Sequence, residues 1–225
     1  MSTPRLRVPA PRRAERRHPW REASFVSLDF EATGLDPARD SIVSFGVVPV
    51  LEGRIVLGGS IHQLVEPHVP PSVRSQKIHE LRPQDLAGSP RLEEAREVLR
   101  RALADRFLLV WFADVEVNFL AAIFGGRRGT WRRRTIDVRN LAIEVDGVPR
   151  SMRAQRGYGL SWAAERLGVP VANPHEALDD ALVTAQIFLV LTGRLPEGAN
   201  PTVADLLRVA GDQRPWVEQR FKPGV

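Results

Sequence analysis

Three segments with strand-like patterning follow one another near the start of the chain, and they constrain its fold more than any other feature. They are FVSLDF from Phe25, SIVSFGVVPV from Ser41 and RIVLGGSIHQLV from Arg54, separated by the turn-prone stretches LDPARD and EG. Strands that succeed one another in this way favour antiparallel pairing. We therefore expect the first three strands to form an antiparallel unit.

Helices and further strands follow in alternation. Apolar residues recur at steps of three and four in 90–104, which predicts an amphipathic helix, and FLLVWF at 107–112 has the composition of a strand. Helical patterns then occupy 114–124, 159–169 and 176–193. The order predicts an α/β fold in which a mixed central sheet, begun by three antiparallel strands, is flanked by helices.

Length and charge suggest three parts. The chain has 225 residues, enough for one well-buried domain, which we place at 23–193. Residues 1–22 carry seven arginines without a hydrophobic period and are expected to form a disordered basic arm, either polyanion-binding or simply solvated. Residues 194–225 are expected to be a tail with a short helix in PTVADLLRVAG.

Composition excludes several kinds of site. The chain has no cysteine, so disulfides, thiolate metal sites and a cysteine nucleophile are excluded, and oxygen and imidazole ligands remain. No apolar run approaches the roughly 20 residues of a membrane span, and we expect a cytoplasmic protein without a membrane partner. The net charge is +5, and nearly all the cationic residues are arginines, which weakly favours a nucleic-acid ligand.

Asp29 and Glu31 are the first candidate site residues. They lie two apart in a predicted strand, so both carboxylates should be on one face of the sheet. Burying two carboxylates together raises at least one pKa, whereas a divalent cation between them turns the repulsion into coordination. Alone, such a pair is also typical of a solvated strand edge.

A second candidate pair lies near the other end of the domain. His175 precedes a predicted helix, and Asp180 falls in the first turns of that helix. A neutral imidazole in this place could accept a proton from water, although a histidine before a helix is more often structural. Asp179 lies about 100° around the helix from Asp180, so we expect it to stabilise the helix N-terminus instead.

Taken together, LDFEATGLDP near the N-terminus and PHEALDDALVTAQIF near the C-terminus resemble the first and third motifs of the DEDDh 3′–5′ exonucleases. Within that family the similarity is greatest to the proofreading epsilon subunits of DNA polymerase III. It extends from about Phe25 to Thr192 and includes IHELRPQDLAGSP after the third strand.

The resemblance implies a ribonuclease H-like fold and phosphodiester hydrolysis with two divalent metal ions, Mg²⁺ or Mn²⁺. It assigns Asp29, Glu31 and Asp180 to the metals and His175 to the role of general base. The corresponding substrate-binding positions are Ala32, Thr33, Gly34, Leu35 and His79. At the residue after His79 the family has glycine and this chain has Glu80.

The middle motif departs from the family. It usually reads His-Asn-Ala-x-Phe-Asp-x-x-Phe-Leu, and here the segment is WFADVEVNFL, which puts Glu116 in the place of the fourth metal-binding Asp. The longer side chain could displace the carboxylate by roughly 1.5 Å, enough to alter activity. Asp114 lies about 200° from Glu116 on a helix and is expected to cap it. A site without a working fourth carboxylate is the remaining alternative.

An arginine-rich stretch, GGRRGTWRRR at 125–134, follows this helix and is predicted to be a loop. Its arginines could follow a phosphate backbone while Trp131 stacks on a base, or the stretch could be a solvated loop. Asp137, just after it, is expected to be a helix N-cap rather than a catalytic acid.

Two classes of function remain. The first is a 3′–5′ exonuclease acting on single-stranded or frayed 3′ ends, with DNA favoured, RNA as the alternative and a DNA polymerase as a potential partner. The second is a nucleic-acid-binding or polymerase-associated module whose catalysis is weakened by the altered middle motif. Metal-dependent turnover separates the two.

Overall fold

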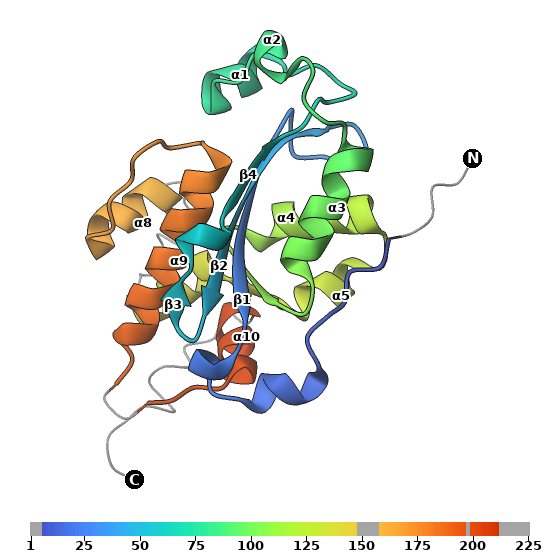
Figure 1. Ribbon diagram of the computed structural model, residues 1–225. Coiled ribbons are helices and arrows are strands. Elements are labelled where there is room, and N and C mark those ends of the chain that lie inside the picture. The colour runs from blue at the N-terminus through green and yellow to red at the C-terminus, as the bar shows by residue number, and fades with distance from the viewer. Residues whose placement is uncertain (1–5, 148–157, 197–198, 212–225) are drawn as a thin grey trace.

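A six-stranded mixed sheet forms the centre of the protein. The computed structural model describes residues 6–147, 158–196 and 199–211 (Figure 1). The strand order is β3-β2-β1-β5-β6, and β4 pairs with β2. The strands are β1 (Phe25–Ala32), β2 (Ile42–Leu51), β3 (Arg54–Ile55), β4 (Ile61–Leu64), β5 (Phe107–Val110) and β6 (Thr135–Asp137).

Helices cover both faces of this sheet (Figure 1). One face packs against α3 (Leu92–Leu103), α4 (Ala113–Phe124) and α5 (Arg128–Arg132). The other packs against α6 (Val138–Val145), α8 (Leu160–Leu167), α9 (Ala177–Gly193) and α10 (Val203–Gly211). The short helices α1 (Val73–His79) and α2 (Pro83–Leu86) lie beyond the carboxyl end of β1. None of the helices in the described ranges has the length and apolar character needed to cross a membrane.

The strand directions confirm the predicted fold class. β2 runs antiparallel to β1, β3 and β4, whereas β5 is parallel to both β1 and β6. The sheet therefore begins with an antiparallel unit and continues in parallel, as alternating helices and strands require.

The third predicted strand is divided in two. Residues 54–65 were expected to form one strand, but the short strands β3 and β4 are separated by a 3₁₀ turn, η3 (Leu57–Gly59). Both pair with β2 at different places along it, β3 opposite Val50 and Leu51 and β4 opposite 44–47. The adjacent glycines 58 and 59 provide no side chains to pack, and the strand is interrupted there.

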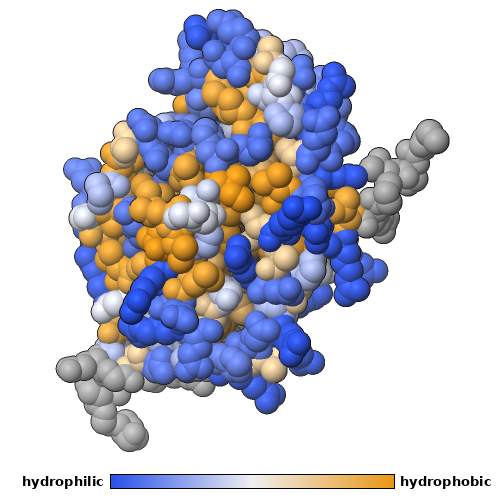
Figure 2. Space-filling view, in the orientation of Figure 1, coloured by the Kyte–Doolittle hydropathy of each residue, from blue (hydrophilic) through white to orange (hydrophobic). Residues whose placement is uncertain are grey.

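The basic N-terminal segment differs from the expected disordered arm. From residue 6 onward it lies against the domain and contains two 3₁₀ turns, η1 (Arg13–Arg17) and η2 (Trp20–Glu22). The Trp20 side chain is 3% exposed and meets Phe188 of α9 edge to face. Burial of this one large aromatic ring anchors the segment. Figure 2 shows mostly hydrophilic residues over the lower end of the molecule, where η1 and η2 lie in Figure 1.

The predicted tail helix is also part of the core. α10 buries Val203, Leu206, Val209 and Ala210 in the same cluster as α6 and α9. The backbone N–H of Trp20 donates to the Pro201 carbonyl, so the two ends of the described chain are tied together. Residues 212–225 lie outside the described residues.

Gly46 sets how closely α9 approaches the sheet. A Cβ atom at position 46 would lie 2.0 Å from the backbone oxygen of Ala177, the first residue of α9. Because the obstruction is backbone rather than a flexible side chain, the helix and strand would have to separate. Only glycine permits this contact.

Replacing Gly46 by alanine should therefore destabilise the protein. We expect Gly46→Ala to lower the free energy of unfolding by about 1–3 kcal/mol, measured by urea denaturation, because the new methyl group overpacks the interface. Gly58→Ala is the matched control, since a Cβ there meets nothing within 4 Å. Equal stabilities of the two variants would contradict the close contact.

Candidate active site

Asp29 and Glu31 lie on the face of β1 that is covered by α9. Alternate residues Val26, Leu28 and Phe30 enter the core on the α3 and α4 side, so the carboxylates point the other way. In the pairing with β2, Asp29 is opposite Gly46 and Glu31 is opposite Ser44. Gly46, which allows the close approach of α9, is therefore the cross-strand neighbour of Asp29.

The start of α9 brings the second motif to the same place. His175 lies in the loop before the helix with a left-handed backbone (φ 65°), and its N–H donates to the Asp180 carboxylate at 3.3 Å. Asp179 points elsewhere and accepts from the Asn173 backbone N–H at 3.0 Å. The predicted separation of these adjacent aspartates is what the structure shows.

Carboxylates from both motifs form one cluster. Oxygen atoms of Glu31 and Asp180 and a ring nitrogen of His175 all lie within 4.8 Å of one another. Burial and the nearby charge of Asp180 raise the pKa of Asp29 well above its usual range. Residues about 150 positions apart in sequence therefore share one electrostatic site.

Glu116 of α4 lies within electrostatic range of Asp29 and Glu31, although its ligand atoms are not among those that converge within 4.8 Å. Its side chain is 4% exposed, and its Oε2 atom has no hydrogen-bond partner in the described part of the chain. Burial first, and then the charge of Asp29, raise the pKa of Glu116 well above its usual value. The charges of Asp29 and Glu31 therefore act on Glu116, the residue that the sequence predicts in place of the fourth Asp.

Asp114 does not cap α4 as expected. The helix begins one residue earlier, with Phe112 at the N-cap, and Asp114 is exposed with its carboxylate 3.5 Å from Arg128 and 3.7 Å from Arg132. Asp137 takes over the capping role. It accepts from the backbone N–H of Ala113 at 3.1 Å and from that of Asn140 at 2.8 Å, so one carboxylate caps both α4 and α6.

The cluster is electrostatically unfavourable without a cation. Burial, followed by repulsion from Asp29 and Asp180, raises the pKa of Glu31 to about 9. Burial also raises the pKa of Asp180 to about 6, an effect that the neighbouring His175 partly offsets. Neutralising such a group of buried oxygens is what a divalent cation does, and hard cations prefer oxygen ligands. The donor set, with one unpartnered carboxylate oxygen, fits a divalent metal ion.

A cleft of about 390 Å³ opens beside the cluster. Glu31 is in its wall, and the remaining lining comes from the end of β1 and the residues after it, from α1 with its N-cap, and from α4. All five positions that the family resemblance assigned to substrate line this cleft: Ala32, Thr33, Gly34, Leu35 and His79. The Thr33 hydroxyl bonds to Asp40 at 3.2 Å, which holds the loop that forms the rim.

His79 ends α1 inside this cleft. Its Nδ1 accepts from the Leu81 backbone N–H at 3.1 Å, and its buried Nε2 has no partner among the described residues. Burial lowers the pKa of His79, and the nearby His175 lowers it further. Glu80 follows with φ 58°, a conformation that glycine adopts without strain, which accounts for the family's glycine at this position.

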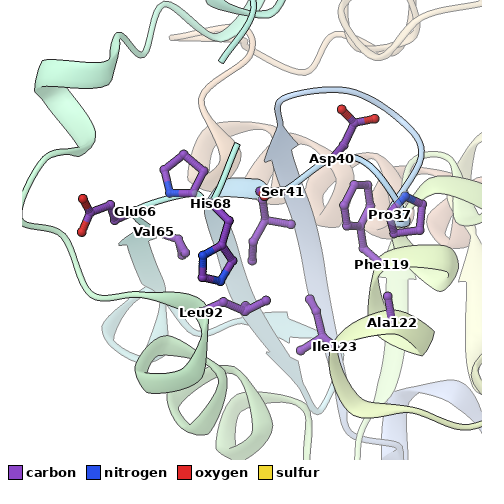
Figure 3. A pocket seen from close by; sticks show the side chains of 12 residues that line it. Pro37, Asp40, Ser41, Val65, Glu66, His68, Leu92, Phe119, Ala122 and Ile123 are labelled. Atoms are coloured by element: carbon purple, nitrogen blue, oxygen red, sulfur yellow. The ribbon is translucent and has the colours of Figure 1, made fainter. Parts of the chain in front are cut away.

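A second hollow of about 220 Å³ lies on the α3 and α4 side, away from the carboxylates (Figure 3). Its floor is apolar, formed by Leu92, Phe119 and Ile123, and His68 points into it. The carboxylates of the cluster are not part of its lining, so we do not assign the reaction to it.

The arginine-rich stretch is not the predicted loop with a stacking tryptophan. It contains α5, and Trp131 is 6% exposed, with its ring against Phe124 and its Nε1 donating to the Gly125 carbonyl. Arg134 is also buried and donates to the carbonyls of Leu103 and Pro9. Trp131 therefore cannot stack on a base, and that interpretation was wrong.

Two residues that position the site were missed by sequence reasoning. Gly46 fits an ordinary buried strand, and only the approach of α9 shows its role. The expectation that Asp137 caps α6 is confirmed, but its second bond to α4 depends on the parallel pairing of β5 with β6. No sequence pattern comparable to the Asp-x-Glu spacing predicts the contact of Gly46 with α9 or the bond of Asp137 to α4.

Comparison with known proteins identifies the family. Residues 26–188 match the family RNase_T, described as "Exonuclease". The chain belongs to this exonuclease family. The DEDDh resemblance seen in the motifs is thereby confirmed.

Curated relatives of the chain include proteins named as DNA polymerase III or its subunits. The chain is 34% identical over 171 residues to DNA polymerase III PolC-type of Thermotoga petrophila, covering 76% of this chain but 12% of that protein. It is 27% identical to DNA polymerase III subunit epsilon of Aquifex aeolicus, over 77% of this chain and 83% of that subunit. The chain thus spans a small part of the PolC-type relatives and most of the epsilon subunit.

Solved structures of other exonucleases share the fold. Exonuclease X in complex with 5′ overhanging duplex DNA aligns with a TM-score of 0.58 and 22% identity, over 81% of this chain and 99% of that one. The nuclease domain of 3′hExo, a DEDDh family member bound to rAMP, aligns with a TM-score of 0.61 and 18% identity, over 76% and 92%. At these identities the likeness establishes the ribonuclease H-like fold.

The raised pKa values predict an unusual pH dependence in the absence of metal. Glu31 (about 9) and Asp180 (about 6) bind protons more tightly in the folded protein than in the unfolded chain. The stability from this protonation is present below the unfolded pKa values and is lost as pH rises through the folded ones. We expect the melting temperature in chelator to fall from about pH 5 to about pH 9, and added divalent metal to restore it most at high pH.

Two substitutions separate this effect from general pH sensitivity. Glu31→Gln should flatten the decline, because it removes a titrating group, whereas Glu94→Gln on the exposed surface of α3 should keep the wild-type profile. Differential scanning fluorimetry across the pH series measures both. Parallel profiles for the two variants would show that the Glu31 carboxyl is not in a charge-repelling site.

Proposed function

We propose that the protein is a 3′–5′ exonuclease that hydrolyses the terminal phosphodiester bond of nucleic acid with two divalent ions, Mg²⁺ or Mn²⁺. The observation that carries the proposal is the group of Glu31, Asp180 and His175, whose ligand atoms lie within 4.8 Å of one another beside an open cleft. The charges of this group and of Asp29 and Glu116 act on one another. We place the catalytic domain at 23–193, with the family match at 26–188 inside it.

The four carboxylates would hold the metal ions. When bound, such ions lower the pKa of water and stabilise charge on the attacking and leaving oxygens. The chain's contribution is to fix the ligands in place: β1 supplies Asp29 and Glu31, and the close approach of α9 at Gly46 supplies Asp180. The unpartnered Oε2 of Glu116 supports its use as a ligand despite the longer side chain.

His175 is proposed as the general base. Its ring nitrogen lies within 4.8 Å of carboxylate oxygens of Glu31 and Asp180, so it borders the place where the metal ions and the scissile phosphate would meet. The bond from its own backbone N–H to Asp180 restrains the loop that carries it. A histidine so placed can take a proton from the attacking water near neutral pH.

The cleft beside the cluster is proposed to bind the terminal nucleotide. Its apolar wall, which includes Leu35 and Ile78, can contact a base, while the backbone near Gly34 allows close approach. With Nδ1 of His79 engaged as an acceptor, Nε2 is free to donate a hydrogen bond to the substrate.

DNA is the favoured substrate. The relatives are DNA polymerase III components, and the similar exonuclease X structure holds DNA. An exoribonuclease is the second candidate, because the similar nuclease domain of 3′hExo binds rAMP. By the same likeness we propose a DNA polymerase as partner. A weakened, nucleic-acid-binding module remains the alternative if Glu116 cannot serve as the fourth ligand.

Digestion of 5′-labelled single-stranded DNA and the matching RNA tests the proposal. The wild type should produce a shortening ladder with Mg²⁺ or Mn²⁺ and none with chelator, on DNA more than on RNA. Asp29→Ala should abolish the ladder. Asp180→Asn should reduce the rate by about 100-fold or more, equivalent to roughly 3 kcal/mol of transition-state stabilisation.

Asp179→Asn is the matched control for Asp180→Asn. The two residues are adjacent on α9, but Asp179 bonds to the Asn173 backbone and its asparagine replacement retains an acceptor oxygen. We expect its rate to stay within a few-fold of the wild type. Equal losses in the two variants would argue against the assignment of Asp180, and binding without products from the wild type would favour the non-catalytic module.

A further inference from the structure

An arginine-lined groove runs along η1, α5 and α10, and its η1 and α10 walls lie at the end of the molecule where β1 starts. η1, α5 and α10 enclose a hollow of about 520 Å³ whose charged lining is Arg16, Arg132, Arg133 and Arg208. A neighbouring hollow of about 650 Å³ continues along η1 and is lined by Arg13, Arg16 and Arg17 together with alanines. These six side chains are called the arginine groove.

Positive charge in this groove is only partly compensated. Arg208 pairs with Asp205, whose carboxylate also bonds to Thr202, and Arg132 lies 3.7 Å from Asp114 and 3.9 Å from Asp137. No carboxylate appears among the described residues that line either hollow. Burial, and then the charges of Arg133 and Arg13, lower the pKa of Arg16. The side chains that line the arginine groove therefore carry a net positive charge.

The arginines are held in place by the fold. The Arg16 guanidinium donates to the Arg133 carbonyl at 2.8 Å, which joins η1 to the residue that follows α5. The Val203 N–H donates to the His18 carbonyl, which joins η1 to α10. Trp20, buried beside Phe188, anchors the segment that carries these bonds. Like charges held together in this way create a standing attraction for a polyanion.

We propose that the arginine groove binds the sugar–phosphate backbone of nucleic acid and holds a long substrate while its 3′ end occupies the cleft. Arginine is suited to this ligand because its planar fork donates two hydrogen bonds to a phosphate. The part concerning the 3′ end rests on the proposed exonuclease function, but backbone binding does not. In Figure 2 the same end of the molecule has a mostly hydrophilic surface.

The separation of the two sites makes the groove a length-dependent contact. The η1 side of the groove lies near the start of β1, whereas the cleft lies past its end, and the eight residues of β1 span about 25 Å. At the roughly 3.4 Å per nucleotide of a stacked B-form strand, about seven or eight nucleotides would connect the η1 arginines to the cleft, and an extended single strand would need fewer. Substrates shorter than this reach the cleft without the groove.

Binding in chelator tests the groove without requiring catalysis. Fluorescence anisotropy with a labelled 30-nucleotide single strand measures the dissociation constant of the full chain over a series of salt concentrations. The variant is Arg13→Ala/Arg17→Ala/Arg133→Ala, which leaves the Arg16 contact intact. The matched control is Arg54→Ala/Arg101→Ala/Arg91→Ala, three exposed arginines on other elements. Circular dichroism and melting confirm that both are folded.

We expect the groove variant to bind about 10- to 100-fold more weakly at low salt, with the slope of log K against log salt reduced by about two units. Its affinity for a dinucleotide should be unchanged, and the control should match the wild type on both. Equal binding of the long strand by groove variant and control would overturn the proposal and leave the groove to an acidic protein segment. Loss of dinucleotide binding as well would also overturn it, because that contact belongs to the cleft.

Discussion

The contact between Gly46 and the first residue of α9 is the constraint on which the site depends. A Cβ at that position would lie 2.0 Å from the Ala177 carbonyl, so the helix can reach the sheet only over a glycine. Gly46 pairs with Asp29, and Asp180 lies within the first turns of α9. Packing of helix on strand, rather than any attraction between the side chains, therefore brings the first and third motifs together. The same interface buries Phe188 and Trp20 and thereby fixes the N-terminal segment.

Repulsion between the carboxylates opposes the assembly of the cluster and indicates that the cluster binds a cation. Glu31, Asp29, Glu116 and Asp180 all have raised pKa values, with burial as the largest cause in each. A fold that assembles buried acids at such a cost must recover it through a bound cation or through protonation. Local hydrogen bonds do not dissipate the repulsion: the Asp180 carboxylate accepts from one backbone N–H, and the Oε2 atom of Glu116 has no partner within the described ranges. The chain belongs to an exonuclease family, and a bound cation would offset the free-energy cost of burying these carboxylates together.

Much of this could be predicted from sequence because the signals were local. The period of two in β1 placed Asp29 and Glu31 on one face, and the helix after His175 separated Asp179 from Asp180. Contacts between distant segments could not be predicted. Trp131 lies in an arginine-rich stretch typical of an exposed loop, yet in α5 its ring packs against Phe124. The basic N-terminal segment packs on the domain because the Trp20 ring contacts Phe188 of α9. The third strand is interrupted at glycines 58 and 59, but the places where its two halves pair with β2 could not be predicted from that segment alone.

Crystals soaked in Mn²⁺ and measured near the manganese absorption edge would test the central claim most directly. We expect anomalous scattering peaks within about 2.0–2.3 Å of carboxylate oxygens of Asp29 and Asp180, with Glu31 and Glu116 completing the ligands, since hard cations bind oxygen at such distances. A soaked Asp29→Asn crystal should lose the peaks. Ordered, empty carboxylates at millimolar Mn²⁺ would contradict the claim that the fold assembles this cluster to hold metal.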